Sequence, residues 1–465
     1  MTIKRTRVRF DSASRRGFLR GMVGVSGLAA VSAGPTAAIL NAFAARPVRA
    51  DVSPDYGPLS PIEDETTGLP LLQLPQGFRY ISYGWTGDPM KDGRPTPAAH
   101  DGMAVVKTNG NNLVLVRNHE VRSVAPSFGK KEITYDPMGG GGTTNLGFNA
   151  EKGEFTKSWA SLAGTSTNCA GGSTPWDSWM TCEETRANAA VGGYQKEHGW
   201  VFDVPAEGQA NPEPIRGMGR FDHEAIAVDP MTGAIYQTED SGSAGFYRYT
   251  PTNYGKPHAG GTLEMLKIVG QNQTDLTGQT IEITKDTSFD VEWVTIGSPE
   301  SVSPSVFNQG FTQGGARFIR LEGCWHEDGG IYFTSTSGGL AREGQIWRYD
   351  ITLQTLTLIF SSPNEETLDN PDNITVHAKR GIVLCEDGDR DGQRMLFLTP
   401  DGQIYPFAAN DIVLDNFKGN TGDFRGREWA GACFSPDGQW LFANIQTPGV
   451  TFAITGPWKD YDLTV

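Results

Sequence analysis

A thiol and several carboxylates lie close together in one short stretch, residues 165–184, with the sequence TSTNCAGGSTPWDSWMTCEE. Cys169 stands just before an Ala-Gly-Gly turn, residues 176–181 have the aromatic composition of a buried strand, and Glu183 and Glu184 close it. A thiolate and carboxylates that meet in one site bind metal ions well. The stretch is also compatible with a buried structural cysteine and two solvated glutamates, so the rest of the chain must decide.

The element that would position these groups is a hairpin unit that recurs along the chain: a first strand, a turn, and a second strand that ends in polar or acidic residues. Six units start at His100, Cys169, His223, Glu322, Asp372 and Gly431. Antiparallel units of this kind predict an all-β fold, a six-bladed β-propeller with loop insertions, as a single domain over residues 51–465. A two-domain β-sandwich is the alternative.

In a propeller, the ends of equivalent strands converge on one face, so residues far apart in sequence can share a site. If the six units superpose, that face collects Glu120, Cys169, Glu183, Glu184, His223, Glu224, Glu239, Asp240, Glu322, Glu386 and Asp387. Carboxylates this crowded cannot all stay ionised without cations among them. Hard carboxylates favour calcium and a single thiolate favours a transition metal. The competing interpretation is that each acid is a solvated turn residue.

Other residues are candidates for contacts with a substrate or an ion. Arg320 alternates with Glu322 on one side of a strand, where a guanidinium could hold an anion or pair with a carboxylate. His223 could be a ligand, a proton donor or a buried structural histidine. The Gly-rich run that ends at Asn145 could offer N–H groups to an anion or be a flexible loop. Residues 387–392, DGDRDG, match the start of a calcium loop without its closing glutamate, so a lone calcium loop and an acidic turn both remain open.

The first 50 residues are predicted to be a leader. The sequence SRRGFLR at 14–20 is a twin-arginine export signature, and a small-residue apolar run and Val48-Arg49-Ala50 follow it. We therefore expect a cleaved signal peptide over residues 1–50, the twin-arginine translocase as a partner during export, and a periplasmic or secreted protein. The run is rich in Gly, Ala and Ser and broken by Pro35, which argues against a stable membrane anchor.

The net charge and the number of cysteines limit the classes of partner and the disulfide bonds that the chain can have. The first 50 residues hold nine of the 39 basic residues and one of the 54 acidic ones, so residues 51–465 carry a formal net charge of −23. This charge argues against nucleic acid and against an anionic membrane surface. The five cysteines are an odd number without a CxxC pair, so a disulfide framework is not expected and at least one thiol has another role.

Together these segments resemble the PhoX family of exported alkaline phosphatases. The resemblance rests on residues 117–120, 167–172, 182–184, 223–224, 238–240, 320–323, 332–339, 384–388, 430–438 and 444–454. It implies a propeller phosphatase that contains ferric iron and calcium and acts on phosphate monoesters as small-molecule substrates. Separately, we expect the protein to be a monomer. By this resemblance Cys169 is an iron ligand, Arg320 contacts phosphate, and the metal ligands include Glu184, Glu239, Glu322 and Glu386.

Two other functions are compatible with the residues. A calcium-stabilised propeller that binds a ligand or partner without catalysis would need the acids but neither Cys169 nor Arg320. A propeller lactonase would use calcium alone. Colour separates them, because a thiolate bound to ferric iron absorbs visible light and a calcium-only protein does not.

Overall fold

The structure is a computed structural model that describes residues 53, 55–190, 193–400 and 402–460. The predicted signal peptide lies outside these residues. The described part is nearly all β: its one α-helix is α2 (Val306–Thr312), beside short 3-10 turns. None of its helices has the length and apolar character needed to cross a bilayer. It belongs to one compact unit of the chain.

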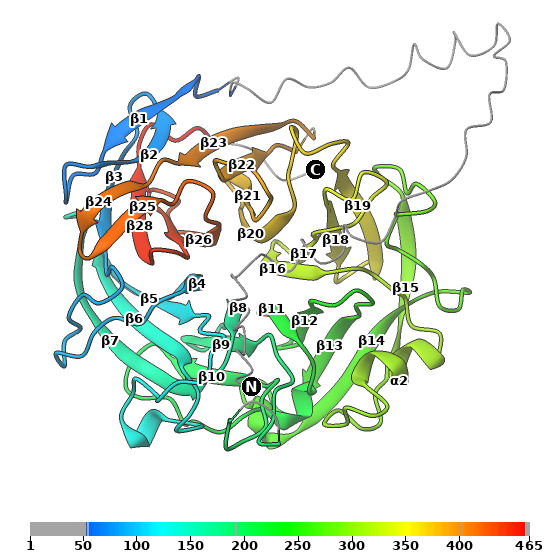
Figure 1. The fold of residues 1–465 in the computed structure, drawn as a ribbon. Coiled ribbons are helices and arrows are strands. Elements are labelled where there is room, and N and C mark those ends of the chain that lie inside the picture. The colour runs from blue at the N-terminus through cyan, green and yellow to red at the C-terminus, as the bar shows by residue number, and fades with distance from the viewer. Residues whose placement is uncertain (1–52, 54, 191–192, 401, 461–465) are drawn as a thin grey trace, which may run out of the picture. The chain divides into compact units, whose positions relative to one another are not determined.

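The strands form six antiparallel blades (Figure 1). Blade 1 consists of β4 (His100–Asn109), β5 (Asn112–His119), β6 (Gly141–Asn149) and β7 (Glu154–Thr165). Blade 2 has β8 (Asn168–Ser173), β9 (Ser178–Glu183) and β10 (Val201–Pro205), and blade 3 has β11 (His223–Val228), β12 (Ile235–Glu239), β13 (Phe246–Pro251) and β14 (Gly261–Ile268). Blade 4 has β16 (Leu321–Glu327), β17 (Gly330–Ser335), β18 (Gln345–Asp350) and β19 (Thr355–Ser361).

Blades 5 and 6 use strands from both ends of the described chain. Blade 5 has β20 (Pro371–His377), β21 (Gly381–Glu386), β22 (Arg394–Leu398) and β23 (Ile404–Asn410), extended by β2 (Pro70–Pro75) and β1 (Leu59–Glu63). Blade 6 has β26 (Trp429–Phe434), β27 (Leu441–Ile445) and β28 (Val450–Thr455), and β3 (Arg79–Tyr83) is its outer strand. This pairing joins β3, from the N-terminal part of the described chain, to β28, its last strand, and closes the ring.

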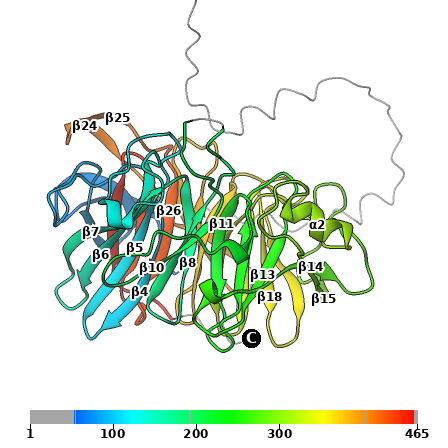
Figure 2. The ribbon, with the colours of Figure 1, turned by 90° about the horizontal axis from the view of Figure 1, so that it is seen from below.

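The remaining strands are additions to this plan. β15 (Ser288–Thr295) pairs with both β14 and β19 and so links blades 3 and 4 in one sheet. β24 (Val413–Phe417) and β25 (Asn420–Asp423) form a separate hairpin, which projects beyond the blades in Figure 2. The innermost strands β4, β8, β11, β16, β20 and β26 each pack against the next, and β26 packs against β4. The predicted six-bladed propeller is confirmed, and the sandwich alternative is wrong.

Each innermost strand carries a β-bulge near its start, directly after the first residue in five blades and after the second residue in β26. The shift in register falls after His100, Asn168, His223, Leu321, Pro371 and Ala430. The residue before the strand is left-handed in four blades, at Ala99, Thr167, Arg320 and Asn370, with φ between 43° and 53°. A bulge bends its strand and turns the bulged side chain out of the alternation. The six strands are therefore distorted in one common way next to the axis.

Close packing of these strands explains two glycines in the bulges. A Cβ on Gly102 would lie 2.5 Å from the Cα of Ala170, and a Cβ on Gly323 would lie 2.6 Å from the carbonyl oxygen of Asp372. Neither space admits a side chain, so the bulged residues Asp101 and Glu322 are each followed by glycine. Away from the axis, apolar and aromatic side chains fill the space between blades, with Trp200, Trp347 and Trp429 fully buried.

Candidate metal centre at the propeller axis

The bulges place metal-binding side chains around the axis. The first bulged residue is Asp101, Cys169, Glu224, Glu322 and Asp372 in blades 1 to 5, and Gly431 in blade 6. In blade 6 the acid comes instead from Glu428, directly before β26. Five of the six bulges thus offer a carboxylate or a thiol.

A second set of polar side chains follows the second strand of each blade. These residues are Glu120, Glu184, Asp240, Thr336, Asp387 and Gln446. In every blade the backbone N–H of this residue donates to the carbonyl of the residue just before the inner strand, over 2.8–3.3 Å. The same hydrogen bond in six blades brings the two sets of side chains to one end of the axis.

We call the resulting group the axis cluster. It consists of Asp101, Glu120, Cys169, Glu184, Glu224, Asp240, Glu322, Asp372, Asp387 and Glu428, together with Arg122, Arg320 and Gln446. Three of its subsets have potential ligand atoms within 4.8 Å of one another: Asp101–Glu120–Cys169, Cys169–Glu184–Glu224 and Asp372–Asp387–Glu428. Cys169 joins the first two, and its Sγ donates to Glu224 Oε1 over 2.7 Å.

Burial and mutual repulsion change the acid–base properties of the cluster. Burial raises the pKa of Asp101 and Glu224, and neighbouring carboxylates raise it further. Burial also raises the pKa of Glu120, although the guanidinium of Arg122 acts in the opposite direction. Burial also raises the pKa of Glu428, that of the Cys169 thiol, and that of Asp372 to about 6. Groups that resist ionisation in this way ionise readily when cations lie among them. The donor set fits two kinds of ion: a thiol with carboxylates suits a transition metal, and carboxylates alone suit calcium.

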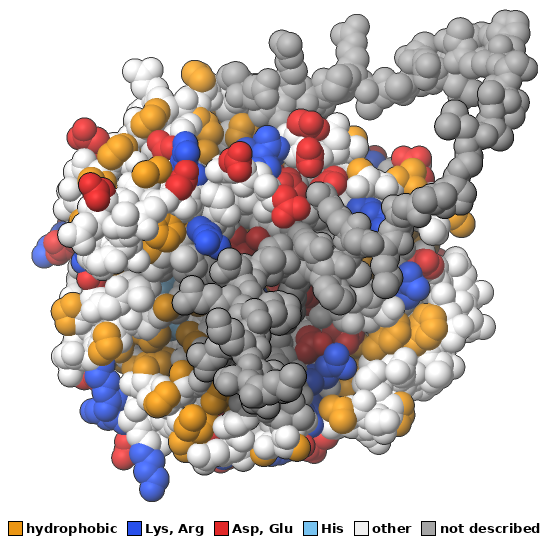
Figure 3. Space-filling model, viewed as in Figure 1, with side chains coloured by type: hydrophobic (Ala, Val, Ile, Leu, Met, Phe, Trp, Pro, Cys, Tyr) orange, Lys and Arg blue, Asp and Glu red, His pale blue; other side chains and the backbone are white. Residues whose placement is uncertain are grey.

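Two arginines lie among the acids. Arg122 contacts Glu120 and lies 3.6 Å from Glu184, while Arg320 contacts Glu322 and donates from Nε to Asp240 over 3.0 Å. Charged side chains of both signs are visible near the middle of the face in Figure 3. Nine carboxylates face only these two guanidinium groups, so the arginines cannot neutralise all the acids once these ionise, which favours further cations.

The structure brings together seven of the residues predicted for the site: Glu120, Cys169, Glu184, Glu224, Asp240, Glu322 and Asp387, with Arg320 beside them. It does not bring Glu183, Glu239, Glu386, His223 or Asn145 there. The three glutamates are the last residues of β9, β12 and β21, and each precedes a member of the cluster. Neighbouring residues of a strand point to opposite sides, so only the second of each acidic pair faces the axis.

The first acid of each pair is held by groups within its own blade. Glu386 accepts from Arg394 Nε and Nη2 over 2.8 and 2.6 Å, and Glu239 accepts from the Tyr247 hydroxyl over 2.6 Å. Glu183 accepts from Ser166 N and Gly199 N, both over 2.9 Å.

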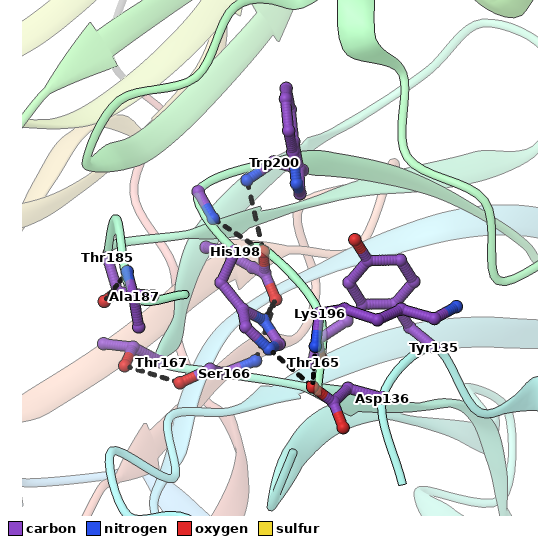
Figure 4. Close-up of polar contacts among 12 residues, drawn as sticks. Tyr135, Asp136, Thr165, Ser166, Thr167, Thr185, Ala187, Lys196, His198 and Trp200 are labelled. Atoms are coloured by element: carbon purple, nitrogen blue, oxygen red, sulfur yellow. Dashed lines mark hydrogen bonds and ion pairs between the residues drawn. The ribbon is translucent and has the colours of Figure 1, made fainter. Parts of the chain in front are cut away.

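Glu183 belongs to a buried network next to the loop that precedes Cys169, and Figure 4 shows His198, Asp136 and Ser166 of this network. His198 Nδ1 lies 2.6 Å from Glu183 Oε1, and its Nε2 lies 3.4 Å from Asp136 Oδ2. Asp136 in turn accepts from the N–H of Lys196 over 2.7 Å. These contacts fix the loop before Cys169, since Ser166 donates its backbone N–H to the same glutamate.

His223 and Asn145 are likewise held elsewhere. The ring of His223 stacks on Phe221 with centroids 3.6 Å apart, and its Nε2 lies 3.0 Å from the carbonyl of Gly219. Asn145 is buried in β6, where its amide donates to the carbonyls of Pro205 and Ala206 over 3.1 and 3.0 Å. These partners hold both side chains away from the axis, and the structure gives neither of them a contact with the axis cluster.

Several members of the cluster were missed in the sequence: Asp101, Arg122, Asp372, Glu428 and Gln446. A signal for two of them was present, because Asp101 and Asp372 occupy the unit position that Cys169, Glu224 and Glu322 occupy. Gln446 is the counterpart of Glu120 and donates to its Oε2 over 2.7 Å. In the DGDRDG segment, Asp387 belongs to a group close enough to share an ion, and Asp389 and Asp391 belong to none of the groups found among the described residues.

Comparison with known proteins agrees with this architecture. The sequence matches the family model of alkaline phosphatase PhoX over residues 55–449. PhoX of Pseudomonas fluorescens, solved in complex with vanadate, a transition state analogue, is 18% identical, with 86% of this chain and 98% of that chain covered and a TM-score of 0.61. A gluconolactonase of Xanthomonas campestris is 15% identical over 86% of this chain and 98% of its own, with a TM-score of 0.38. No curated protein matches the sequence. The family model spans most of the chain, and the chain belongs to the PhoX family of alkaline phosphatases.

Proposed function

We propose that the axis cluster binds ferric iron and calcium and hydrolyses phosphate monoesters there. The observation that supports this most is the position of Cys169, one thiol shared by two groups of carboxylates whose ligand atoms lie within 4.8 Å of one another. A structural calcium site needs no thiol, whereas a site for a transition metal gains from one. Membership of an alkaline phosphatase family gives the reaction class.

The residues divide by donor chemistry. Cys169 would hold iron, together with carboxylates from Asp101, Glu120, Glu184 and Glu224. The all-carboxylate group of Asp372, Asp387 and Glu428 would hold calcium. When bound, the ions supply Lewis-acid chemistry, which neutralises negative charge on the phosphate oxygens.

The two arginines are our candidates for contacts with the phosphoryl group. A guanidinium presents its N–H groups in a fork that matches phosphate oxygens. Arg320 is held by Asp240 and Glu322, and its side chain keeps 21% exposure; Arg122 keeps 49%. Both therefore combine a fixed position with access from solvent. His223 and Asn145 have no role in this proposal.

The cellular setting is also proposed. The leader supports a signal peptide over residues 1–50, recognition by the twin-arginine translocase, and a periplasmic or secreted phosphatase domain over residues 51–465, which we expect to act as a monomer. Export in the folded state would allow iron and calcium to be bound before the chain leaves the cytoplasm.

The test is made on protein purified after export. Iron and calcium are measured by elemental analysis, and phosphate release is followed with p-nitrophenyl phosphate. We expect Arg320→Met to lower the rate about 100-fold or more at unchanged metal content, because one donor to the transferring group is lost. Arg317→Ala is the control, since Arg317 is half-buried and lies 3.7 Å from Asp275, outside the cluster. Fully metallated wild-type protein that releases no phosphate from a monoester would refute the proposal.

A further inference from the structure

In the bulges that carry the axis cluster, backbone carbonyls lose their partners in the regular hydrogen-bond ladder. A bulged residue leaves the regular hydrogen-bond ladder, so its buried carbonyl needs another partner. The carbonyls concerned belong to Asp101, Cys169, Glu322 and Asp372, the residues whose side chains form the axis cluster. Whatever satisfies these carbonyls also fixes the direction of the side chains.

In four blades the partner is a side chain from the preceding blade. Asn118 Nδ2 donates to the carbonyl of Cys169 over 3.1 Å and to that of Ala170 over 2.7 Å. Thr238 Oγ1 donates to the carbonyl of Glu322 over 2.6 Å. The two remaining bonds are Thr334 Oγ1 to Asp372, 2.9 Å, and Asn444 Nδ2 to Asp101, 2.6 Å.

These four donors occupy one structural position. Each lies two residues before the polar residue that follows the second strand, namely Glu120, Asp240, Thr336 and Gln446. Each is fully buried, and each reaches from its own blade to the next in chain order, with blade 6 reaching blade 1. In blades 2 and 5 the same position holds Cys182 and Cys385. A hydrogen bond repeated at equivalent sites in four blades is a feature of the site's construction and not an isolated contact.

Two of the donors are themselves fixed by further hydrogen bonds. Asn118 Oδ1 accepts from Trp179 Nε1 and Thr181 Oγ1, both over 2.9 Å, so the orientation of its amide is determined. Thr238 Oγ1 accepts from the backbone N–H of Ala225, over 3.0 Å, in the bulge of its own blade. Thr238 therefore connects the bulges that carry Glu224 and Glu322.

We propose that Asn118, Thr238, Thr334 and Asn444 are positioning residues, which act between blades to hold the bulged backbone and so aim the candidate ligands at the metal ions. The inference rests on the proposed function for the role of the ions, but the hydrogen bonds exist without them. Groups behind metal ligands typically change metal affinity by about 10- to 100-fold when removed.

Thr238 offers the cleanest test, because Thr238→Val keeps the shape and removes the hydroxyl. Thr238→Ser restores the hydroxyl. Thr143→Val is the matched control: its hydroxyl is also buried, but its hydrogen bond to Ser161, over 2.7 Å, stays within blade 1 and does not reach the bulge of an inner strand. Amide hydrogen exchange over residues 321–327 is measured in metal-free protein. Calcium affinity and the amount of iron that stays bound are measured in metallated protein.

We expect Thr238→Val to speed exchange over residues 321–327 and to weaken calcium binding or iron retention about 10- to 100-fold, with wild-type behaviour in Thr238→Ser and Thr143→Val. Unchanged exchange and affinity in Thr238→Val, or an equal loss in Thr143→Val, would overturn the positioning role. Wild-type protein that binds neither metal would refute the proposed function instead, since the exchange result does not depend on metal. If Thr238→Val does not fold, the same comparison is made with Thr334→Val, with amide hydrogen exchange measured over residues 371–377.

Discussion

The adjacent acids Glu386 and Asp387 should have separate roles despite their proximity in sequence. Glu386 is fully buried and receives two hydrogen bonds from Arg394, which is itself 12% exposed. Asp387 faces the axis, where its carboxylate can share an ion with Asp372 and Glu428. Glu386 should therefore matter for folding and Asp387 for metal binding.

The expected size of each effect follows from these surroundings. Glu386→Gln leaves the guanidinium of Arg394 in a buried site without its carboxylate, and breaking a buried pair in this way costs about 3–5 kcal/mol of unfolding free energy. Asp387→Asn removes one negative ligand from a three-carboxylate site, so calcium should bind at least about tenfold more weakly. Relief of repulsion should leave the stability of metal-free Asp387→Asn at or above that of wild type.

Urea denaturation of chelated protein measures the first effect, and calcium titration of folded protein measures the second. Both variants are measured by both assays, so each serves as the control for the other. Loss of calcium binding in Glu386→Gln at conditions where it is folded would show that the alternation along β21 does not separate the two acids. Equal stability losses in the two variants would contradict the reasoning as well.

Three further predictions concern the thiol, pH and the ions. Cys169→Ser should lose iron, colour and at least about 99% of phosphatase activity, because a hard hydroxyl replaces the soft ligand. Cys433→Ser, whose side chain lies in an apolar core, should keep all three. Iron content and the rate of phosphate release are measured for both variants. Burial raises the pKa of Glu239 to about 7, so the protonated form stabilises the fold and this stabilisation is lost as pH rises through 7. Between pH 4.5 and 8 the unfolding free energy of wild type should therefore fall by up to about 3 kcal/mol relative to that of Glu239→Gln. An equal pH dependence of the unfolding free energy in the two proteins, measured by denaturation, would contradict this. Calcium at 100 times its Kd should raise the unfolding free energy of metal-free protein by about 2.7 kcal/mol, seen as a melting temperature roughly 3 °C higher for a domain of this size, with magnesium as the control ion.

The blade plan could be predicted because each blade is a local feature of the sequence. A hairpin of two apolar strands with a short turn is encoded within one continuous segment, and six such segments fix the number of blades. The closing contact is not local: β3 pairs with β28 across most of the chain, and nothing in the short strand at residues 79–83 specifies its partner. The link between blades 3 and 4 through β15 depends in the same way on a pairing between distant segments.

The site was predicted in outline because acids follow apolar strands at the same position in several units. Choosing the correct acid of each pair required knowledge of which residue faces the axis, and one residue of shift exchanges the two sides of a strand. The unit pattern placed both acids of each pair on this face and the resemblance favoured Glu239 and Glu386, whereas the structure places Asp240 and Asp387 at the axis. Arg122 lies beyond the end of β5, where no periodic pattern reports the direction of a side chain.

The bulges explain how the fold tolerates this cluster. Nine carboxylates near one axis repel one another, and a flexible loop would move them apart into water. Here each acid or its neighbour is tied to a strand by backbone hydrogen bonds that recur in all six blades, and the bulge carbonyls of four blades are tied to the blade before. The repulsion therefore cannot be relieved by movement of the chain, and it is relieved by protons or by cations. In the metal-free protein the acids relieve the repulsion by keeping protons, as their raised pKa values show. In the metallated protein the bound ions relieve it. A scaffold that prevents its ligands from separating thus gains affinity for cations from the same repulsion that would otherwise destabilise it.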